Sequence, residues 1–305
     1  MSVTVRSEIV DLDGLIPRAV DNDREDLDVA RLIPWIFRQT GVELVEDDCT
    51  MGWPQEEMNF RDLFLYLSSY CYEVYEREVG TTNALKACET ISLPMRNWKQ
   101  PEREYSRSFI RTQGLMLNML MHTIYNILDG IREDRPRIMC QKYIIGGKRF
   151  ASKSEGSAMV RLQEGLVPII SYTGWFEGMT WDQFPMETLS IMLGQLAKNT
   201  SIRTGNIGVQ DQEVYVVGFY GRYIHVPRGL FPADTIARVH SQGCSRDEAF
   251  DLKFTRGYDL CLKKDWLEAT HALTRLYRYL LSGNTKASAV QAYLQRAITT
   301  GNNIP

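Results

Sequence analysis

The sequence predicts an α/β protein (mixed α+β), with a central mixed sheet of about 4–5 strands flanked by helices and helical additions at both ends. Between residues 156 and 227, short apolar runs alternate with one helical pattern. On either side of this stretch, the hydrophobic spacing is mostly helical. The chain has 305 residues, of which 44% are hydrophobic and 24% charged, a composition typical of folded globular proteins.

Two regions are expected. Residues 1–100 form a mostly helical, acidic region packed on the core, and residues 101–305 form an α/β core domain with C-terminal helices. The first 60 residues carry fourteen acidic and five basic side chains, although the net charge of the whole chain is only −3. This acidic segment is a candidate surface for a protein partner. The alternatives are an internal charge match and a solvated acidic surface.

The first region contains one long amphipathic helix, whose apolar residues recur every three or four positions and which ends before Gly80. Pro34 interrupts an earlier helical pattern because proline removes a backbone donor. The expected elements, in order, are a short strand at Val3–Val5, a helix at Asp23–Gln39, a strand at Val42–Val45, the amphipathic helix at Asn59–Val79 and a short helix at Asn83–Ser92.

The longest expected helix runs from Pro101 to Arg132. The last two thirds of this helix are apolar on nearly every side, which is typical of a buried helix. We interpret His122, within the apolar part, as a hydrogen-bonded core histidine. The first third carries basic residues spaced by four, so they project from one face: Arg103, Arg107 and Arg111.

After this helix the hydrophobic period changes from 3.6 to 2. Gly146-Gly147 signals a turn, and residues 148–156 form a polar arm. The expected elements are strands at Ile138–Ile145, Ser157–Gln163 and Leu166–Tyr172, a helix at Met186–Asn199, and strands at Glu213–Phe219 and Tyr223–Val226.

The C-terminal part is expected to add helices to this core. Residues 227–232 form a turn, and Pro232 opens a helix that ends near Gly243. The later elements are a strand at Phe250–Phe254 and helices at Trp266–Leu281 and Lys286–Ile298.

A nuclease-like pattern lies in the middle of the chain. The third expected strand has the apolar run Val167–Ile170, which is followed by Ser171 and Thr173. The order of helix, three strands, helix and strand between residues 102 and 219 resembles the core of the PD-(D/E)XK, or restriction-endonuclease-like, superfamily. In that family the second strand carries an Asp and the third carries Glu-x-Lys. Their acidic groups hold magnesium, which stabilises charge on the displaced phosphate.

The resemblance implies a degenerate site in this chain. Ser171 occupies the position of the family's Glu and Thr173 that of its Lys, and the second strand has no Asp. Neither hydroxyl replaces a carboxylate in holding a divalent ion. Three acidic residues are candidates for a displaced ligand, with a surface carboxylate as the alternative in each case: Glu155, Glu164 and Glu187.

A basic edge is the candidate nucleic-acid surface. The three arginines of the long helix would join Lys148, Arg149 and Lys153 if the helix begins beside the polar arm. The alternative is a solvated helix face paired with local acids.

Other chemistry has no motif in the sequence. The six cysteines form no CxxC pair, so we expect free thiols, and His240 with Cys244 provides too few ligands for a metal. We expect no metal and no cofactor. The N-terminus lacks the pattern of a secretory signal, and no stretch is apolar enough to span a bilayer, so we expect an intracellular, cytoplasmic or nuclear protein without membrane contact.

These observations favour a catalytically inactive nuclease-like domain that acts as a nucleic-acid or protein binding module. One alternative is a helical scaffold or interaction protein without nucleic-acid binding. A second is an active enzyme whose site has no recognised motif.

Overall fold

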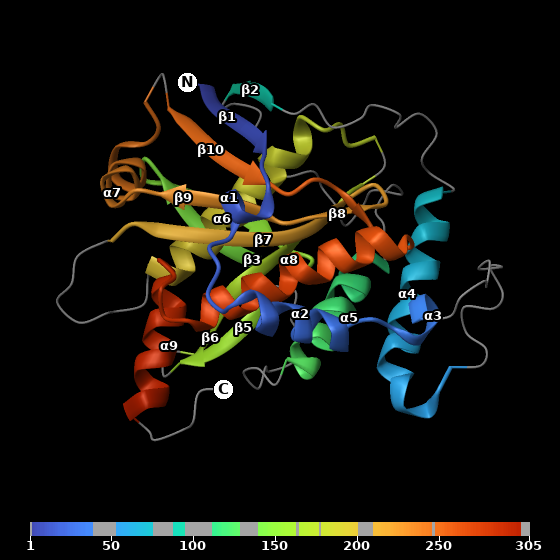
Figure 1. Ribbon diagram of the computed structural model, residues 1–305. Coiled ribbons are helices and arrows are strands. Elements are labelled where there is room, and N and C mark those ends of the chain that lie inside the picture. Colours follow the sequence, from blue (N-terminus) through green and yellow to red (C-terminus); the bar gives the residue numbers. More distant parts are fainter. Residues whose placement is uncertain are drawn as a thin grey trace.

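The computed structural model describes residues 2–38, 53–75, 88–94, 112–128, 140–162, 165–176, 178–200, 210–245 and 248–299. Within these ranges the chain forms a mixed main sheet with helices on both faces, and a separate two-stranded sheet (Figure 1). The mixed α+β class predicted from the sequence is confirmed. The main sheet is larger than the predicted 4–5 strands, because the described residues supply nine.

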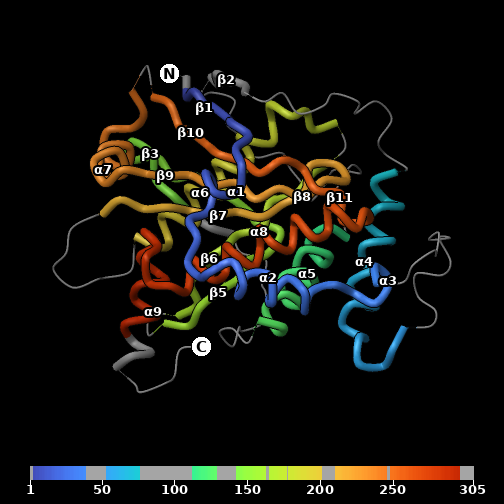
Figure 2. The backbone as a smooth tube through the Cα atoms, in the orientation of Figure 1, coloured from blue at the N-terminus to red at the C-terminus, as the bar shows by residue number. Residues whose placement is uncertain are grey.

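The strands of the main sheet are joined in the order β5-β6-β7-β9-β10-β1-β2, and β8 and β11 extend it from another part of β7. Segments from the two ends of the chain thus lie side by side, since β1 pairs with β10 in parallel (Figure 2). The strands are β1 Ser2–Ile9, β2 Cys88–Pro94, β3 Cys140–Ile145, β4 Lys148–Lys153, β5 Gly156–Leu162, β6 Gly165–Thr173, β7 Gln212–Tyr220, β8 Tyr223–His225, β9 Pro227–Phe231, β10 Ala249–Phe254 and β11 Tyr258–Asp259.

Strand β7 lies at the centre of the sheet. Residues 170–173 of β6 pair with its residues 215–218 in parallel, and β9 and β8 pair with its other edge in antiparallel fashion. All side chains from Gln212 to Phe219 are buried. An almost continuous apolar run is what a strand covered on both faces requires.

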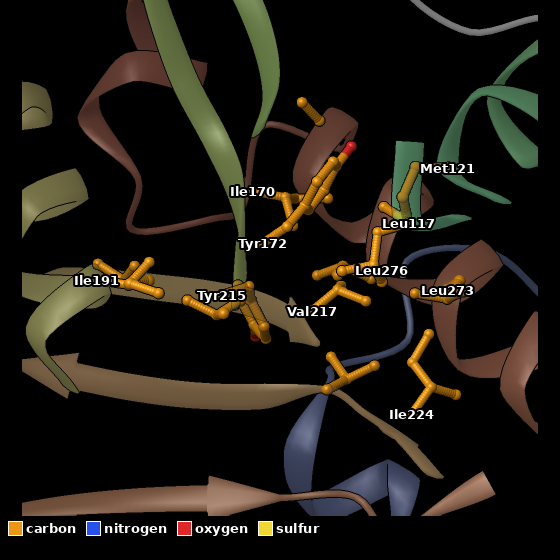
Figure 3. Packing of buried hydrophobic residues seen from close by; sticks show 14 of the residues in the cluster. Leu117, Met121, Ile170, Tyr172, Ile191, Tyr215, Val217, Ile224, Leu273 and Leu276 are labelled. Carbon is orange, nitrogen blue, oxygen red and sulfur yellow. The ribbon is translucent and has the colours of Figure 1, made fainter. Parts of the chain in front are cut away.

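Helices cover both faces of this strand (Figure 1). Helix α6 crosses over from β6 to β7 on one face, and α5 and α8 lie on the other. Leu117 and Met121 of α5 approach Tyr172 of β6, and Leu276 of α8 approaches Val217 of β7 (Figure 3). The helices are α1 Leu12–Leu15, α2 Asn22–Arg31, α3 Trp35–Arg38, α4 Met58–Tyr75, α5 Thr112–Ile127, α6 Gln183–Thr200, α7 Ala233–Gln242, α8 Lys263–Leu281 and α9 Ser288–Thr299.

Three elements differ from the sequence prediction. The helix predicted at Asn83–Ser92 is wrong over its last five residues, because β2 is a strand that pairs with β1 along seven positions. The polar arm contains β4, which pairs with β3. The turn at residues 227–232 contains β9. In each case the segment forms a strand because it pairs with another strand, β2 with β1, β4 with β3, and β9 with β7 and β10. This pairing overrides the local propensity of the segment.

His122 was also predicted incorrectly. It lies on the exposed side of α5, where Asn126 Nδ2 is 3.1 Å from its ring Nδ1. Leu115, one of the apolar residues of the helix, is 44% exposed. The described part of this helix is therefore buried along one broad side and not all round.

The acidic front segment is in part matched inside the protein. Glu25 and Asp28 of α2 are both 1% exposed and face the basic side of α8. The guanidinium of Arg275 donates to Glu25 at 2.8 Å, and that of Arg278 donates to Asp28 at 2.8 Å. His271 also lies 2.8 Å from Glu25. Two ion pairs thus attach the first helices to α8 with their charges removed from water.

Replacing Arg275 by Met leaves the buried carboxylate of Glu25 without its strongest partner. We expect the free energy of unfolding to fall by about 3 kcal/mol, measured by urea denaturation. The double variant Glu25→Leu with Arg275→Met should recover much of this loss because neither charge remains buried. Arg6→Ala is the control: its pair with Asp251 is 54% and 69% exposed and should contribute about 0–1 kcal/mol. Equal losses in Arg275→Met and Arg6→Ala would contradict this interpretation.

His225 of β8 is fully buried beneath aromatic rings. The rings of Trp181 and Phe184 lie 5.4 and 5.9 Å from its imidazole, and its Nδ1 lies 3.2 Å from the carbonyl oxygen of Thr255. Burial disfavours the charged form and lowers the pKa of His225 from 6.5 to about 4. The residue is therefore a neutral part of the core.

Because this pKa is lower in the folded than in the unfolded chain, the unfolded chain binds more protons between pH 4 and 6.5. We expect the free energy of unfolding to fall by about 3 kcal/mol as the pH decreases through that window. The variant His225→Gln should lose this part of the pH dependence, whereas His240→Gln, at an exposed position, should keep it. Denaturant titrations at a series of pH values test this expectation, and identical slopes for the two variants would refute it.

Candidate functional site

The two positions compared with the nuclease motif are packed inside the protein. Ser171 and Thr173 of β6 are both 0% exposed. Because side chains alternate along a strand and Tyr172 faces α5, both hydroxyls face α6 (Figure 3). Thr173 lies against Gly218 of β7 so closely that a Cβ there would be 2.2 Å from the threonine methyl group. This packing leaves little space for a hydrated ion beside Thr173.

The acidic candidates lie on different sides of the core. Glu155 precedes β5 and lies beside the first turn of α5, where a Cβ on Gly114 would be 3.5 Å from the carboxylate oxygen Oε2. Glu187 of α6 lies one turn before Ser190, whose hydroxyl is 3.1 Å from that of Tyr143 in β3. Burial, with a smaller contribution from the nearby Glu187 charge, raises the pKa of Tyr143 to about 12.

These positions do not bring carboxylates together. Glu155 faces α5, Glu187 faces the β3–β4 hairpin, and Ser171 and Thr173 lie between α6 and the sheet. Glu164 lies outside the described residues. Among the described residues, no group of three acidic, histidine or cysteine side chains has the geometry to hold a metal ion.

His240 and Cys244 lie near the end of α7 with different environments. Cys244 is 2% exposed, and burial raises the pKa of its thiol to about 11. His240 is exposed. A thiol that stays protonated is a poor metal ligand.

The β3–β4 hairpin has a basic solvent-facing side. Its register places Lys142 opposite Ala151 and Ile144 opposite Arg149 on one side, while Tyr143 on the other side is buried against α6. Lys142 and Arg149 are exposed, Lys153 on the same side is half-buried, and Lys148 is exposed at the turn. Within the described part of the chain, no ion pair joins Lys142, Lys148 or Arg149 to an acid.

We call Lys142, Lys148, Arg149 and Lys153 the basic hairpin surface. Three of them were expected from the sequence, and Lys142 was missed. The alternation of side chains across the Gly146-Gly147 turn could have identified Lys142. If residues 148–153 are recognised as a strand, this alternation places Lys142 on the same side of the hairpin as Arg149. Arg103, Arg107 and Arg111 lie outside the described residues, so their proximity to this hairpin remains a prediction.

A cavity of about 360 Å³ lies between the hairpin, α6 and α7. Its volume is at the lower end of the range of small-molecule sites. The lining is mostly apolar and comes from β3, α6, β9, α7 and β10. The lining residues are Lys142, Tyr143, Ile144, Ile145, Leu193, Leu196, Ala197, Thr200, Phe231, Thr235, Ile236, Val239, His240 and Phe250. We call this space the α6–α7 cavity.

The hairpin is tied to α7 through its turn. The backbone amide of Gly146 donates to the carbonyl oxygen of Val239 at 3.0 Å. The backbone amide of Gly147 donates to the carbonyl oxygen of His240 at 3.4 Å. Gly146, with φ 54°, approaches Gly243, the residue after α7, with φ 87°. A Cβ on Gly146 would be 3.1 Å from the Cα of Gly243. The two glycines therefore permit a close backbone approach between the hairpin turn and the end of α7.

Comparisons with known proteins identify no family. No protein-family model matches this chain, and no curated protein is significantly similar to it in sequence. Among the described helices, none has the length and hydrophobicity required to cross a membrane.

The contact between hairpin and α7 can be measured with two alanine substitutions. Gly146→Ala places a side chain at positive φ, which costs about 1–2 kcal/mol of unfolding free energy. The new Cβ also forces the backbones of residues 146 and 243 apart. Gly147→Ala is a matched control, because it also has positive φ but no atom within 4 Å of its Cβ. We expect the loss in unfolding free energy to be larger for Gly146→Ala by about 1 kcal/mol or more, measured by urea denaturation. Equal losses would show that the approach to α7 contributes nothing.

Proposed function

We propose that this protein is a binding module that holds nucleic-acid phosphates on the basic hairpin surface and does not cleave them by a metal-dependent mechanism. The observation that carries the proposal is the exposed group of Lys142, Lys148 and Arg149 on one small hairpin, without an acidic partner among the described residues. Closely spaced cations attract a polyanion and release its counterions. Binding of this kind requires no base-specific contact.

The absence of cleavage is proposed for a separate reason. Metal-dependent phosphate hydrolysis needs oxygen ligands that converge on one or two ions. Ser171 and Thr173 are neutral, and Glu155 and Glu187 face different neighbouring elements. The proposed relation to the restriction-endonuclease-like superfamily therefore rests on the order β5, β6, α6 and β7 alone, with binding retained and hydrolysis lost.

A gel-shift titration with single-stranded and duplex oligonucleotides tests the proposal. We expect binding whose affinity falls steeply between about 50 and 200 mM salt, with the logarithm of the binding constant decreasing linearly with the logarithm of the salt concentration. The double variant Lys148→Glu with Arg149→Glu should bind about tenfold or more weakly at low salt and show a shallower salt dependence. Lys263→Glu is the control, because it reverses an equally exposed charge on α8. Arg107→Glu tests whether the helix arginines belong to the same surface.

Two outcomes would refute this proposal. One is binding that is unaffected by the hairpin variant but reduced equally by the control. The other is magnesium-dependent cleavage that Glu155→Gln or Glu164→Gln abolishes, since either would identify an active acidic site.

A protein partner on the acidic region is the second candidate function. Asp23 and Asp26 are exposed on the outer side of α2, and Leu27, which follows Asp26, is 63% exposed. An exposed leucine among acids is favourable for a basic, partly apolar protein surface. This alternative predicts no salt-sensitive retention of oligonucleotides, so the same titration separates the two functions.

A further inference from the structure

The α6–α7 cavity shares Lys142 with the basic hairpin surface, but the rest of its lining is mostly apolar. We propose that it binds a small amphipathic carboxylate, a molecule with an apolar tail and one anionic end. The tail lies between α6 and α7, and the carboxylate lies at the side lined by Lys142 and His240.

The apolar part of the ligand follows from the walls. Leu193, Leu196 and Ala197 line the α6 side, and Ile236 and Val239 line the α7 side. Phe231 and Phe250 line it from the sheet, with ring centroids 6.1 Å apart. None of these side chains offers a hydrogen bond, so a polar tail would lose its water without compensation.

The sign of the polar end follows from the remaining lining. Lys142 of β3 carries a positive charge, and His240 of α7 offers ring nitrogens from the facing element. Thr200 and Thr235 add neutral hydroxyls. Among the described residues, no Asp or Glu lines the cavity. A carboxylate is therefore stabilised by charge at this position, whereas a cationic ligand meets only repulsion from Lys142.

The size limits the length of the tail. A volume of 360 Å³ has room for about a dozen water-sized groups, at roughly 30 Å³ each. Decanoate, with its ten carbons and two oxygens, matches that number. We therefore choose decanoate as the probe for this class of ligand.

Contacts within the protein join the walls of the cavity. The backbone bonds from Gly146 and Gly147 to Val239 and His240 join its hairpin and α7 walls. The hydroxyl of Tyr143 in β3 lies 3.1 Å from the hydroxyl of Ser190 in α6, and this contact joins the hairpin to α6. A site that is already formed loses less conformational entropy when it binds.

Isothermal titration calorimetry with decanoate on the full chain tests the proposal, at concentrations below those at which decanoate forms micelles. We expect saturable binding at one site, with decyltrimethylammonium binding at least about tenfold more weakly, since it has the same tail but the opposite charge. Ala197→Phe fills the cavity from α6 and should weaken decanoate binding by about tenfold or more. Thr235→Phe fills it from α7 and serves if Ala197→Phe does not fold.

Ala237→Phe is the control for both filling variants, because Ala237 is exposed on α7 and does not line the cavity. Lys142→Met should weaken decanoate binding by about tenfold and leave decan-1-ol binding unchanged. The proposal is overturned if decanoate does not bind saturably, if it binds no better than the cation, or if the filling variants bind as the control does.

The outcome is independent of the proposed function. Lys148→Glu with Arg149→Glu changes neither wall of the cavity and should leave decanoate binding intact, although it weakens oligonucleotide binding. Ala197→Phe should have the opposite pattern. Failure of one proposal is thus distinguishable from failure of the other.

Discussion

The hydrogen bonding of β7 on both of its edges is the constraint from which the rest of the described fold follows. One edge is satisfied by β6 in parallel and the other by β9 and β8. A parallel pair requires a crossover, and α6 provides it on one face. The other face must then be covered by different helices, α5 and α8. Arg275 and Arg278 on the outer side of α8 in turn bind the first helices of the chain through Glu25 and Asp28.

The β3–β4 hairpin packs on α6 and is not part of the main sheet. This position has two consequences for function. Its outer side stays in solvent and presents cations, and its turn reaches α7 at Val239 and His240. The space left between hairpin, α6 and α7 becomes the cavity. A single local feature, the Gly146-Gly147 turn, thus supports both the proposed polyanion surface and the proposed ligand site.

Between α5 and α6 the described part of the chain forms four strands, β3 to β6, one more than the nuclease-like order expected from the sequence, and only β5 and β6 belong to the main sheet. The two positions compared with the nuclease motif, Ser171 and Thr173, are buried in the packing of this sheet. Thr173 occupies space against Gly218 that a hydrated ion would need. The nearest acidic residues are directed toward other elements. Binding and hydrolysis make different demands on such a fold, because a surface of mobile cations binds phosphate in many geometries, whereas hydrolysis requires ligands placed on a common ion.

The sequence by itself determined the class of the fold and the positions of most described helices and strands, because these depend on local periodicity and residue type. Only the tertiary structure decided that residues 88–94 form a strand and that Ile144 and Val239 line one cavity. Pairing partners far apart in the chain leave no local signal. The sequence also could not predict the burial of Glu25 and Asp28 on α2. Residue type alone does not show whether a carboxylate faces water or a buried arginine.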